Sequence, residues 1–471
     1  MNQQLKTDLE NIRQLLLETM EECVAYLETL ETRPVSRDPE SQTLLGLPNE
    51  GIGALRTLSL FKQRYSANLT ASSGPRSFGY VVGGTTPAAL AGDWLTSAFD
   101  QDNGEGITVH IENEAIHLLR QLFKLSEQNF GSFVSGATMS NFVGLALARQ
   151  WIAERRGVDV AGSGLYSMAP ITVFCGTPHS SIYKAMSMLG MGRQNMVLVP
   201  CLPNSESCDP AELELLLRGR EEESIVVANA GTVNDTSFDD FVRIGELKRK
   251  YGFWLHVDAA FGLFAACSPE YDHLVKGIDC ADSITVDLHK WLNVPYDSAI
   301  QFTKHKALQR SVFQNSNAAY LGEPGEMTDY MNYTPETSRR LRALTVWFTV
   351  MAYGAEGYRE IVERDCSMAK LLAERIRASK YFEVLCPTRL NVVCFTLSKD
   401  TGSASSGDVR DFLGQLTSDG EVFMTATTYK GSAGIRAALC NWRTSERDVQ
   451  IAYEALERCA ASRRPYVGSR A

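Results

Sequence analysis

Apolar residues recur at steps of three and four along the first thirty positions of the chain. The residues that make this stripe are Leu5, Leu9, Ile12, Leu16, Met20, Cys23, Leu27 and Leu30. The spacing predicts a helix with one apolar face. That face can pack on its own domain or against a partner subunit. Because the stripe is long and is followed by two irregular stretches, residues 32–35 and 46–53, we favour a partner subunit and therefore a dimer.

From about Phe130 the pattern changes to short runs of β-branched and other apolar residues, separated by helical segments. The runs predict strands over residues 130–134, 171–175, 196–200, 225–229, 254–258, 284–287 and 299–303. Seven strands that alternate with helices imply a mostly parallel sheet covered on both faces.

A second region follows a helix predicted over residues 341–353 and mixes helices, such as 358–378, with further strands. These strands are predicted over residues 383–385, 392–397, 422–425 and 434–439. We interpret this region as a smaller α/β domain. The predicted parts of the chain are an N-terminal helical dimerisation segment (residues 1–85), a large domain (86–345) and a small C-terminal domain (346–471).

The composition is that of an ordinary folded enzyme, with 44% hydrophobic and 22% charged residues among 471. The formal net charge of -10, without a stripe of Lys and Arg, argues against a nucleic-acid partner. The 11 cysteines are scattered and form no CxxC pair. We therefore expect reduced cysteines, mostly in the core, and neither a metal site nor a disulfide framework.

The start of the chain carries no secretory pattern. Residues 1–4 are followed by an acidic helical segment rather than by a basic start and an apolar stretch. No apolar run approaches the roughly 18 residues of a membrane span. We expect a cytoplasmic protein that does not contact a membrane.

Lys290 is the residue that most narrows the chemistry, because it directly follows the strand predicted up to Asp287. A lysine delivered by a buried strand into a polar corner is suited to nucleophilic attack on a carbonyl. Asp258 ends another predicted strand. An imine-forming lysine with a strand-end aspartate is what a pyridoxal phosphate site requires. The aspartate would keep the ring nitrogen protonated, although an acidic residue at a strand end, considered alone, is more often a cap or turn residue.

Three further strand ends carry groups that can join this site, since ligands of open α/β sheets bind beyond the carboxyl ends of the strands. Residues 135–141 open a helix whose free N–H groups and hydroxyls can hold a phosphate, although small residues open many helices. His179 brings an imidazole, which could also be bonded near a helix N-terminus. Thr232 offers a hydroxyl donor to a cofactor oxygen. Their order along the chain, together with the aspartate and the lysine, favours one shared site.

These stretches also resemble a known family. The motifs that carry the resemblance are residues 135–141, 178–181, 230–232, 256–260 and 287–297. As a set they resemble the group II pyridoxal-phosphate-dependent decarboxylases, which include aromatic amino acid, glutamate, histidine and diaminobutyrate decarboxylases. The resemblance runs from about Tyr80 to Thr444. It implies the aminotransferase-like fold type I and a homodimer with active sites at the subunit interface.

The resemblance also implies a role for each motif residue. Lys290 would be the Schiff-base lysine and Asp258 the partner of the pyridinium nitrogen. His179 would stack on one face of the ring, and the small Ala260 would lie against the other. The further cofactor contacts would be Ala137, Thr138, Thr232 and His289.

Residues 317–321 resemble the mobile catalytic loop of the family, in which a tyrosine supplies a proton to the product. That residue here is Tyr320. Phenylalanine at this place is associated with oxidative aldehyde synthases, so Tyr320 favours simple decarboxylation. The alternative is an aromatic residue that only packs in a loop.

Several positions depart from the family pattern. Asp287 stands where relatives often carry asparagine, and its carboxylate would repel a phosphate. Val233 replaces the second member of a threonine pair, and Met139 replaces a common glutamate. Val82 stands where some aromatic decarboxylases have a threonine near the substrate. Tyr80 could present an aromatic wall, which favours a flat aromatic substrate or is simply a core tyrosine.

The sequence thus predicts pyridoxal-phosphate-dependent decarboxylation of an L-amino acid, with an aromatic one favoured, to an amine and CO2. The same scaffold and cofactor could instead yield an aldehyde or a new carbon–carbon bond. A non-catalytic regulatory homologue is the third alternative, but it would be expected to lack Lys290, Asp258 or His179.

Overall fold

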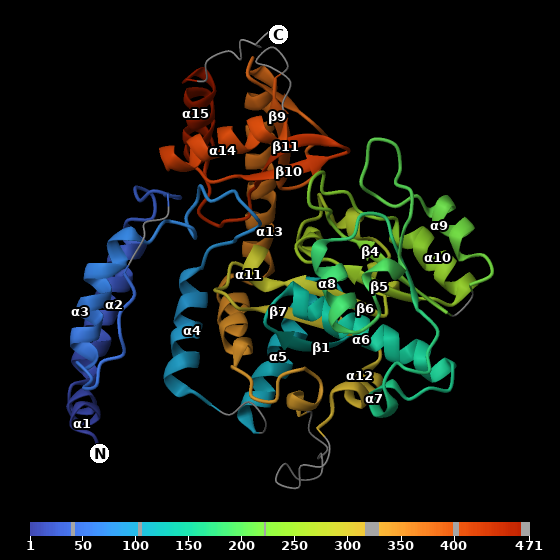
Figure 1. Ribbon diagram of the computed structural model, residues 1–471, viewed down its shortest axis with the longest axis horizontal. Helices are drawn as coiled ribbons and strands as arrows, with labels where there is room; N and C mark the ends of the chain where they lie inside the picture. The colour runs from blue at the N-terminus through green and yellow to red at the C-terminus, as the bar shows by residue number, and fades with distance from the viewer. Residues whose placement is uncertain (39–42, 102–105, 221–222, 316–328, 399–404, 463–471) are drawn as a thin grey trace.

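The computed structural model describes residues 1–38, 43–101, 106–220, 223–315, 329–398 and 405–462. Figure 1 shows an N-terminal helical arm, a large domain around one sheet, and a small domain that contains the last strands and helices. The arm consists of α1 (Gln3–Glu10), α2 (Ile12–Glu28) and α3 (Ala54–Arg64). The domain limits given above, at residues 85 and 345, stay predictions.

The large domain contains the seven predicted strands, each within two residues of its predicted bounds. They are β1 (Phe130–Val134), β2 (Thr172–Cys175), β3 (Met196–Leu198), β4 (Ser224–Asn229), β5 (Trp254–Asp258), β6 (Ser283–Asp287) and β7 (Ala299–Thr303). Their order in the sheet is β1-β7-β6-β5-β4-β2-β3. Only β7 runs antiparallel to its neighbours, β1 and β6. The prediction of a mostly parallel sheet is confirmed.

Helices cover both faces of this sheet because its strands are apolar on both. Ile225 and Val227 of β4 pack with α6 (Ala137–Arg155) and α8 (Ser180–Met188), whereas Val226 and Ala228 face the larger core on the other side. That core includes α5 (Ile107–Leu122), α9 (Pro210–Leu217) and α10 (Phe241–Tyr251). The remaining helices of the domain are α4 (Pro87–Phe99), α7 (Val160–Ser163), α11 (Leu288–Trp291) and α12 (Lys306–Phe313).

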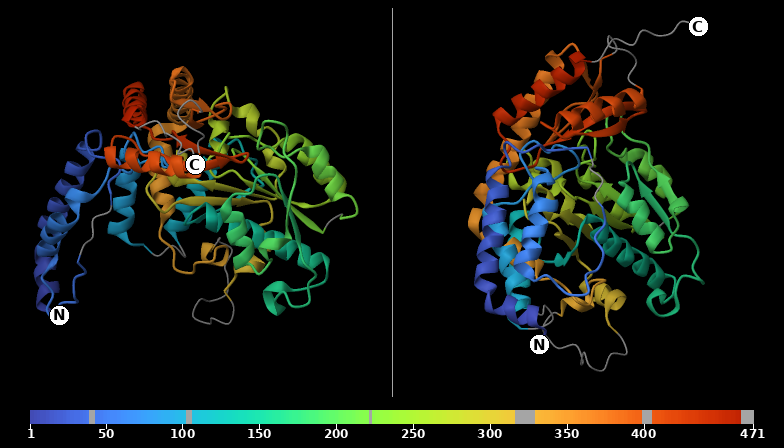
Figure 2. Two further views of the ribbon diagram at one scale, coloured as in Figure 1. Left: turned by 45° about the horizontal axis from the view of Figure 1, so that its top comes forward. Right: turned by 60° about the vertical axis from the view of Figure 1, so that its left-hand side comes forward.

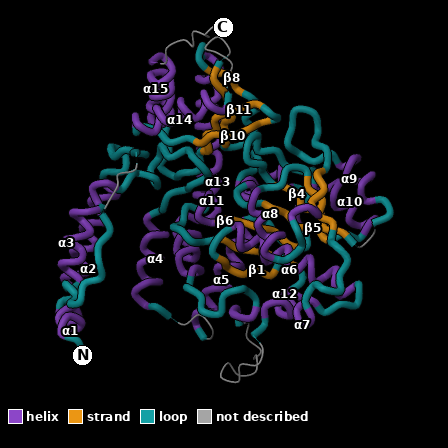
Figure 3. Tube along the Cα trace, viewed as in Figure 1, coloured by secondary structure: helices purple, strands orange, loops and turns teal. Residues whose placement is uncertain are grey.

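The small domain is built on a second, antiparallel sheet with the order β10-β11-β9-β8. Its strands are β8 (Phe382–Val384), β9 (Val392–Leu397), β10 (Thr425–Tyr429) and β11 (Ser432–Ala438). Figure 3 shows the strands gathered in these two places. The helices α14 (Ser406–Asp419) and α15 (Glu446–Ser462) complete the domain.

The prediction of a strand over residues 422–425 was wrong, because β10 begins only at Thr425. Val422 and Met424 are buried, but they pack as an irregular segment against the core of the small domain. The strand itself is Thr-rich and half exposed, so its apolar signal is weak. Lys430 and Gly431 both have positive φ (46° and 83°) and form the tight turn to β11.

The two helices predicted over 341–353 and 358–378 form one element, α13 (Arg342–Ala378). Gly354 breaks its regularity with φ 59° and ψ -172°, a conformation that glycine adopts without strain. Figure 1 shows that α13 runs from the large domain into the small one.

The N-terminal arm is attached to the small domain just beyond its helices. Arg76 forms a buried ion pair with Asp448 of α15 (3.1 Å), and the Val35 N–H donates to the Gly420 carbonyl. Figure 2 shows the arm at the edge of the molecule. The first part of the predicted apolar stripe stays uncovered within one chain, since Leu5, Leu9 and Leu16 are 64%, 63% and 60% exposed, whereas Leu30 at its end is buried.

Across the part of the chain that the structure describes, every helix is too short or too polar to cross a lipid bilayer. In the same residues, no group of three or more His, Cys, Asp and Glu side chains could hold a metal ion.

Candidate active site

A cavity of about 520 Å³ lies beyond the carboxyl ends of β4, β5 and β6, within the size range of small-molecule sites. Nine residues predicted from sequence line it: Tyr80, Ala137, Thr138, His179, Thr232, Asp258, Ala260, His289 and Lys290. Val81 lines the cavity, whereas Val82, predicted to be near the substrate, is absent from its lining among the described residues. Tyr320 lies outside the described residues.

Lys290 follows β6 within the short helix α11 and enters the cavity with its side chain 19% exposed. Its Nζ lies 3.4 Å from Asp287 Oδ2 and 5.9 Å from the centre of the Phe261 ring. The chain at Gly83 packs directly on this turn, where a Cβ atom would lie 1.8 Å from the Lys290 carbonyl oxygen.

Asp258 ends β5, lines the cavity and is 7% exposed. Its Oδ2 accepts a hydrogen bond from Asn141 Nδ2 (3.0 Å), and its Oδ1 accepts one from the Ala260 N–H (3.2 Å). The carboxylate is therefore held in one orientation, with a negative charge at the end of the cavity.

His179 is the N-cap residue of α8, so the alternative that its ring is bonded near a helix N-terminus is correct. The residue also lines the cavity. Its Nδ1 accepts the Ser181 N–H (3.3 Å) and lies 2.7 Å from Ser181 Oγ. Burial lowers the pKa of His179, although Asp258 opposes this shift. The ring is therefore neutral at neutral pH and carries its hydrogen on Nε2.

The N-terminus of α6 forms another wall of the cavity, where backbone N–H groups and the helix dipole favour an anion. The first of these groups, the Ala137 N–H, donates to Asp287 Oδ1 (3.1 Å). The same carboxylate lies 3.2 Å from His289 Nδ1. Burial alone would raise the pKa of Asp287, but Lys290 and His289 hold it below its ordinary value. Asp287 thus places a negative charge at the predicted phosphate position.

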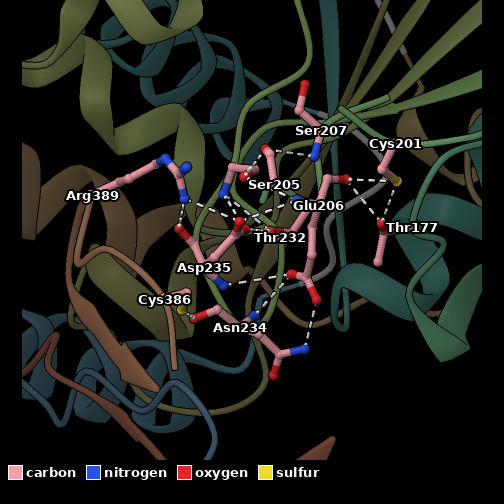
Figure 4. A network of polar contacts seen from close by, with 11 residues as sticks. Thr177, Cys201, Ser205, Glu206, Ser207, Thr232, Asn234, Asp235, Cys386 and Arg389 are labelled. Carbon is pink, nitrogen blue, oxygen red and sulfur yellow. Dashed lines mark hydrogen bonds and ion pairs between the residues drawn. The ribbon is translucent and has the colours of Figure 1, made fainter. Parts of the chain in front are cut away.

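Thr232 lines the cavity as predicted, but its hydroxyl proton is directed elsewhere. It donates to Asp235 Oδ1 (2.8 Å), so donation to a cofactor oxygen is not the arrangement found. Asp235 is fully buried and also pairs with Arg389 of the small domain (3.0 Å). Figure 4 shows this network, in which Asn234 Nδ2 donates to Glu206 (2.7 Å). Contacts between the large and the small domain therefore hold the turn after β4 in place.

Arg436 is a cavity residue that the sequence reasoning missed. Its Nη1 donates to the Tyr80 carbonyl (2.7 Å) and its Nε to the Val233 carbonyl, so it ties two walls of the cavity together. Burial lowers its pKa to about 10. The available signal was an arginine inside the strand predicted over residues 434–439, whose other positions are apolar or glycine.

Amine, carboxylate, imidazole and helix N-terminus thus surround one cavity, and this donor set fits pyridoxal phosphate. Lys290 would hold its aldehyde carbon, Asp258 its ring nitrogen, and α6 with His289 its phosphate. The fold and the site define a pyridoxal-phosphate-dependent enzyme of fold type I.

The chain belongs to the family described as pyridoxal-dependent decarboxylase conserved domain, whose model matches residues 60–398. It is 26% identical over 457 residues to 4-hydroxyphenylacetaldehyde synthase of Rhodiola rosea, covering 93% of this chain and 92% of that protein. It is 24% identical over 466 residues to aromatic-L-amino-acid decarboxylase of Catharanthus roseus, covering 92% and 90%. The crystal structure of Oryza sativa TDC with PLP and tryptamine matches with a TM-score of 0.87 at 23% identity, covering 96% and 98%. The chain is therefore a pyridoxal-phosphate-dependent amino acid decarboxylase.

Asp287→Asn is expected to tighten pyridoxal phosphate binding about tenfold, because it removes a negative charge beside the phosphate position. Fluorescence titration of the cofactor-free protein measures the dissociation constant. Asp272→Asn, which breaks only a surface ion pair with Lys124, is the control and should leave it unchanged. Weaker binding by Asp287→Asn would mean that the carboxylate supports the site rather than opposing the phosphate.

Proposed function

We propose that this decarboxylase acts on an aromatic L-amino acid and releases the amine and CO2. The observation that carries the proposal is the single cavity shared by Lys290, Asp258 and His179. Tyr80 and Tyr296 stand at its rim, 67% and 62% exposed, and offer aromatic surfaces to a flat side chain. The names of the Rhodiola and Catharanthus relatives, both of aromatic chemistry, support this choice of substrate.

Each residue contributes to breaking the bond between Cα and the carboxylate. Bound pyridoxal phosphate supplies the sink for the electron pair that the departing CO2 leaves behind. Asp258 places its negative charge where the ring nitrogen must stay protonated, held by the donors Asn141 and Ala260. His179 would offer a neutral ring face to the bound cofactor. The amine of Lys290 would hold the cofactor again once the product has left.

The product also requires a proton at Cα, and we assign its delivery to Tyr320. Tyr320→Phe is expected to keep CO2 release but to shift the product from amine to aldehyde, because without the positioned acid dissolved O2 can act as the two-electron oxidant, and water then releases the nitrogen as ammonia with peroxide as the reduced product. Measuring amine, aldehyde and peroxide against CO2 decides the matter. Unchanged amine output by this variant would remove Tyr320 from the proton-donor role.

We further propose a homodimer, with a cytoplasmic location as the accompanying prediction. The uncovered apolar face of α1 and α2 supports a second copy of the chain as the missing cover. Sedimentation of wild type and of Leu9→Glu/Leu16→Glu would test it, since two charges on the face should favour the monomer.

The decisive experiment offers the purified, cofactor-loaded enzyme a panel of aromatic and non-aromatic L-amino acids. Amine in step with CO2 from aromatic substrates is the expected result. Aldehyde and peroxide in step with CO2 would instead assign the oxidative reaction, and carbon–carbon coupled product would assign the third alternative. Turnover confined to glutamate or diaminobutyrate would overturn the aromatic preference.

A further inference from the structure

Behind the cavity, buried side chains without an assigned role form a chain of hydrogen bonds that ends on Asp258. Asn141, on α6, is fully buried. Its Nδ2 donates to Asp258 Oδ2 (3.0 Å), and its Oδ1 lies 2.8 Å from His256 Nε2. Because the amide nitrogen faces the carboxylate, the amide oxygen must face the histidine, and His256 Nε2 must be the donor.

The other end of the chain fixes the same direction. Trp254 Nε1, which can only donate, bonds Ser283 Oγ over 3.1 Å, and Ser283 Oγ lies 2.8 Å from His256 Nδ1. The serine hydroxyl therefore donates to Nδ1. Burial lowers the pKa of His256 to about 4, so the ring stays neutral and Nδ1 remains an acceptor at neutral pH. Every hydrogen in the chain points toward Asp258.

A branch of the chain reaches the second residue proposed to touch the cofactor ring. Asn141 Nδ2 also donates to Ser181 Oγ (3.0 Å), and the hydroxyl of Ser181 lies 2.7 Å from His179 Nδ1. Because His179 Nδ1 already accepts a backbone N–H, the Ser181 hydroxyl must donate to it. One carboxamide thus connects the carboxylate and the imidazole of the site.

The packing of α6 on β5 leaves room for this series of hydrogen bonds. Trp254, His256 and Asp258 alternate along β5 and therefore point to the same face, the one that α6 covers. Gly144 of α6 lies over the imidazole, where a Cβ atom would be 2.5 Å from His256 Cε1. The helix can approach the strand closely enough for Asn141 to reach Asp258 only because residue 144 has no side chain.

We infer that Asn141 and His256 are positioning residues of the decarboxylase. Asn141 fixes the Asp258 carboxylate and the His179 ring relative to each other, and His256 fixes the orientation of the Asn141 amide. The inference rests on the proposed roles of Asp258 and His179. Hydrogen bonds in a buried chain polarise one another, so the donation that reaches Asp258 depends on its distant members.

Asn141→Ala is expected to lower kcat about tenfold, a loss of about 1.4 kcal/mol, and to change KM little. His256→Leu should behave in the same way, whereas His256→Gln, which keeps an amide donor toward Asn141, should recover most of kcat. Ser140→Ala is the matched control, because Ser140 is equally buried on α6 but bonds Thr285 and the Ile300 carbonyl instead. It should leave kcat within about twofold of wild type. Equal kcat for Asn141→Ala and wild type at equal cofactor content would overturn the inference.

A second measurement keeps the test independent of activity and of whether every variant folds. NMR of ¹⁵N-labelled histidine in the wild-type enzyme, which has only 7 histidines, reports the tautomer of each ring. His256 is expected to be neutral with its hydrogen on Nε2 throughout pH 6–8. A hydrogen on Nδ1, or a His256 ring that titrates in this range, would contradict the series of hydrogen bonds and overturn the inference. A wild-type enzyme that shows the expected His256 signal but releases no CO2 would instead count against the proposed function.

Discussion

Replacing Lys290 by alanine is expected to lower kcat by at least about 10³-fold, on the scale measured when a covalent catalytic group is removed. The structure gives the physical reason. Lys290 is the one lysine among the described lining residues of the cavity, so no neighbouring amine can take its place. Initial rates of CO2 release measure the loss.

Two further variants separate loss of chemistry from loss of charge. Lys290→Arg keeps a cation beside Asp287 but cannot form an imine, so it should be as inactive as the alanine variant. Lys370→Ala, which removes a surface ion pair with Glu270, should retain full activity. Borohydride reduction should fix the cofactor to the peptide that contains Lys290 in wild type and in Lys370→Ala alone. Turnover above a tenth of the wild-type rate in Lys290→Ala would remove the lysine from the covalent role.

The sheet and the cavity lining could be predicted because their signals are local. A buried strand leaves a continuous apolar run, and the residue that follows it must lie at the carboxyl edge of a parallel sheet. Asp258 and Lys290 were therefore predicted to share a site from their positions alone, and both line the cavity. The exception, β10, is a half-exposed Thr-rich strand whose pattern carries little apolar signal.

The directions of side-chain hydrogen bonds could not be predicted, because each depends on a partner distant in the sequence. The proton of Thr232 is committed to Asp235, and that carboxylate is held in place by Arg389, more than 150 residues further along. The contact of Asn141 with both Asp258 and His256 depends in the same way on the approach of a helix to a strand. That Val81 rather than Val82 lines the cavity also follows from the folded path of the backbone, which the sequence pattern does not specify.

Asp365, on α13, is the second place where a single substitution should have a large effect. It is fully buried, and its Oδ2 accepts the indole N–H of Trp291 (2.7 Å), the residue after Lys290. Its Oδ1 is buried without a hydrogen-bond partner among the described residues. Burial raises the pKa of Asp365 to about 8, although the Trp291 hydrogen bond opposes the shift. The carboxyl group is therefore largely protonated in the folded protein at neutral pH.

Because the folded pKa lies above the unfolded value of 3.8, the folded state binds this proton more tightly. The corresponding stability is fully present below pH 3.8 and is lost as the pH rises to about 8. The interval of about 4 pH units corresponds to at most roughly 6 kcal/mol of unfolding free energy. Asp365→Asn cannot ionise and can still accept the Trp291 hydrogen bond, so it should match wild type near pH 4 and be more stable by several kcal/mol at pH 9.

Urea unfolding of both proteins at pH 5, 7 and 9, at one protein concentration, measures this difference. The gap should widen with each step in pH, whereas Asp240→Asn, a change at the exposed N-cap of α10, should show a constant gap from wild type. Parallel curves for Asp365→Asn and wild type would mean that Asp365 is ionised in the folded protein at neutral pH. In that case the Trp291 N–H would donate to a buried, ionised carboxylate rather than to a neutral carboxyl group. Removing that charge by Asp365→Asn should then weaken the turn that holds Lys290, and with it cofactor binding.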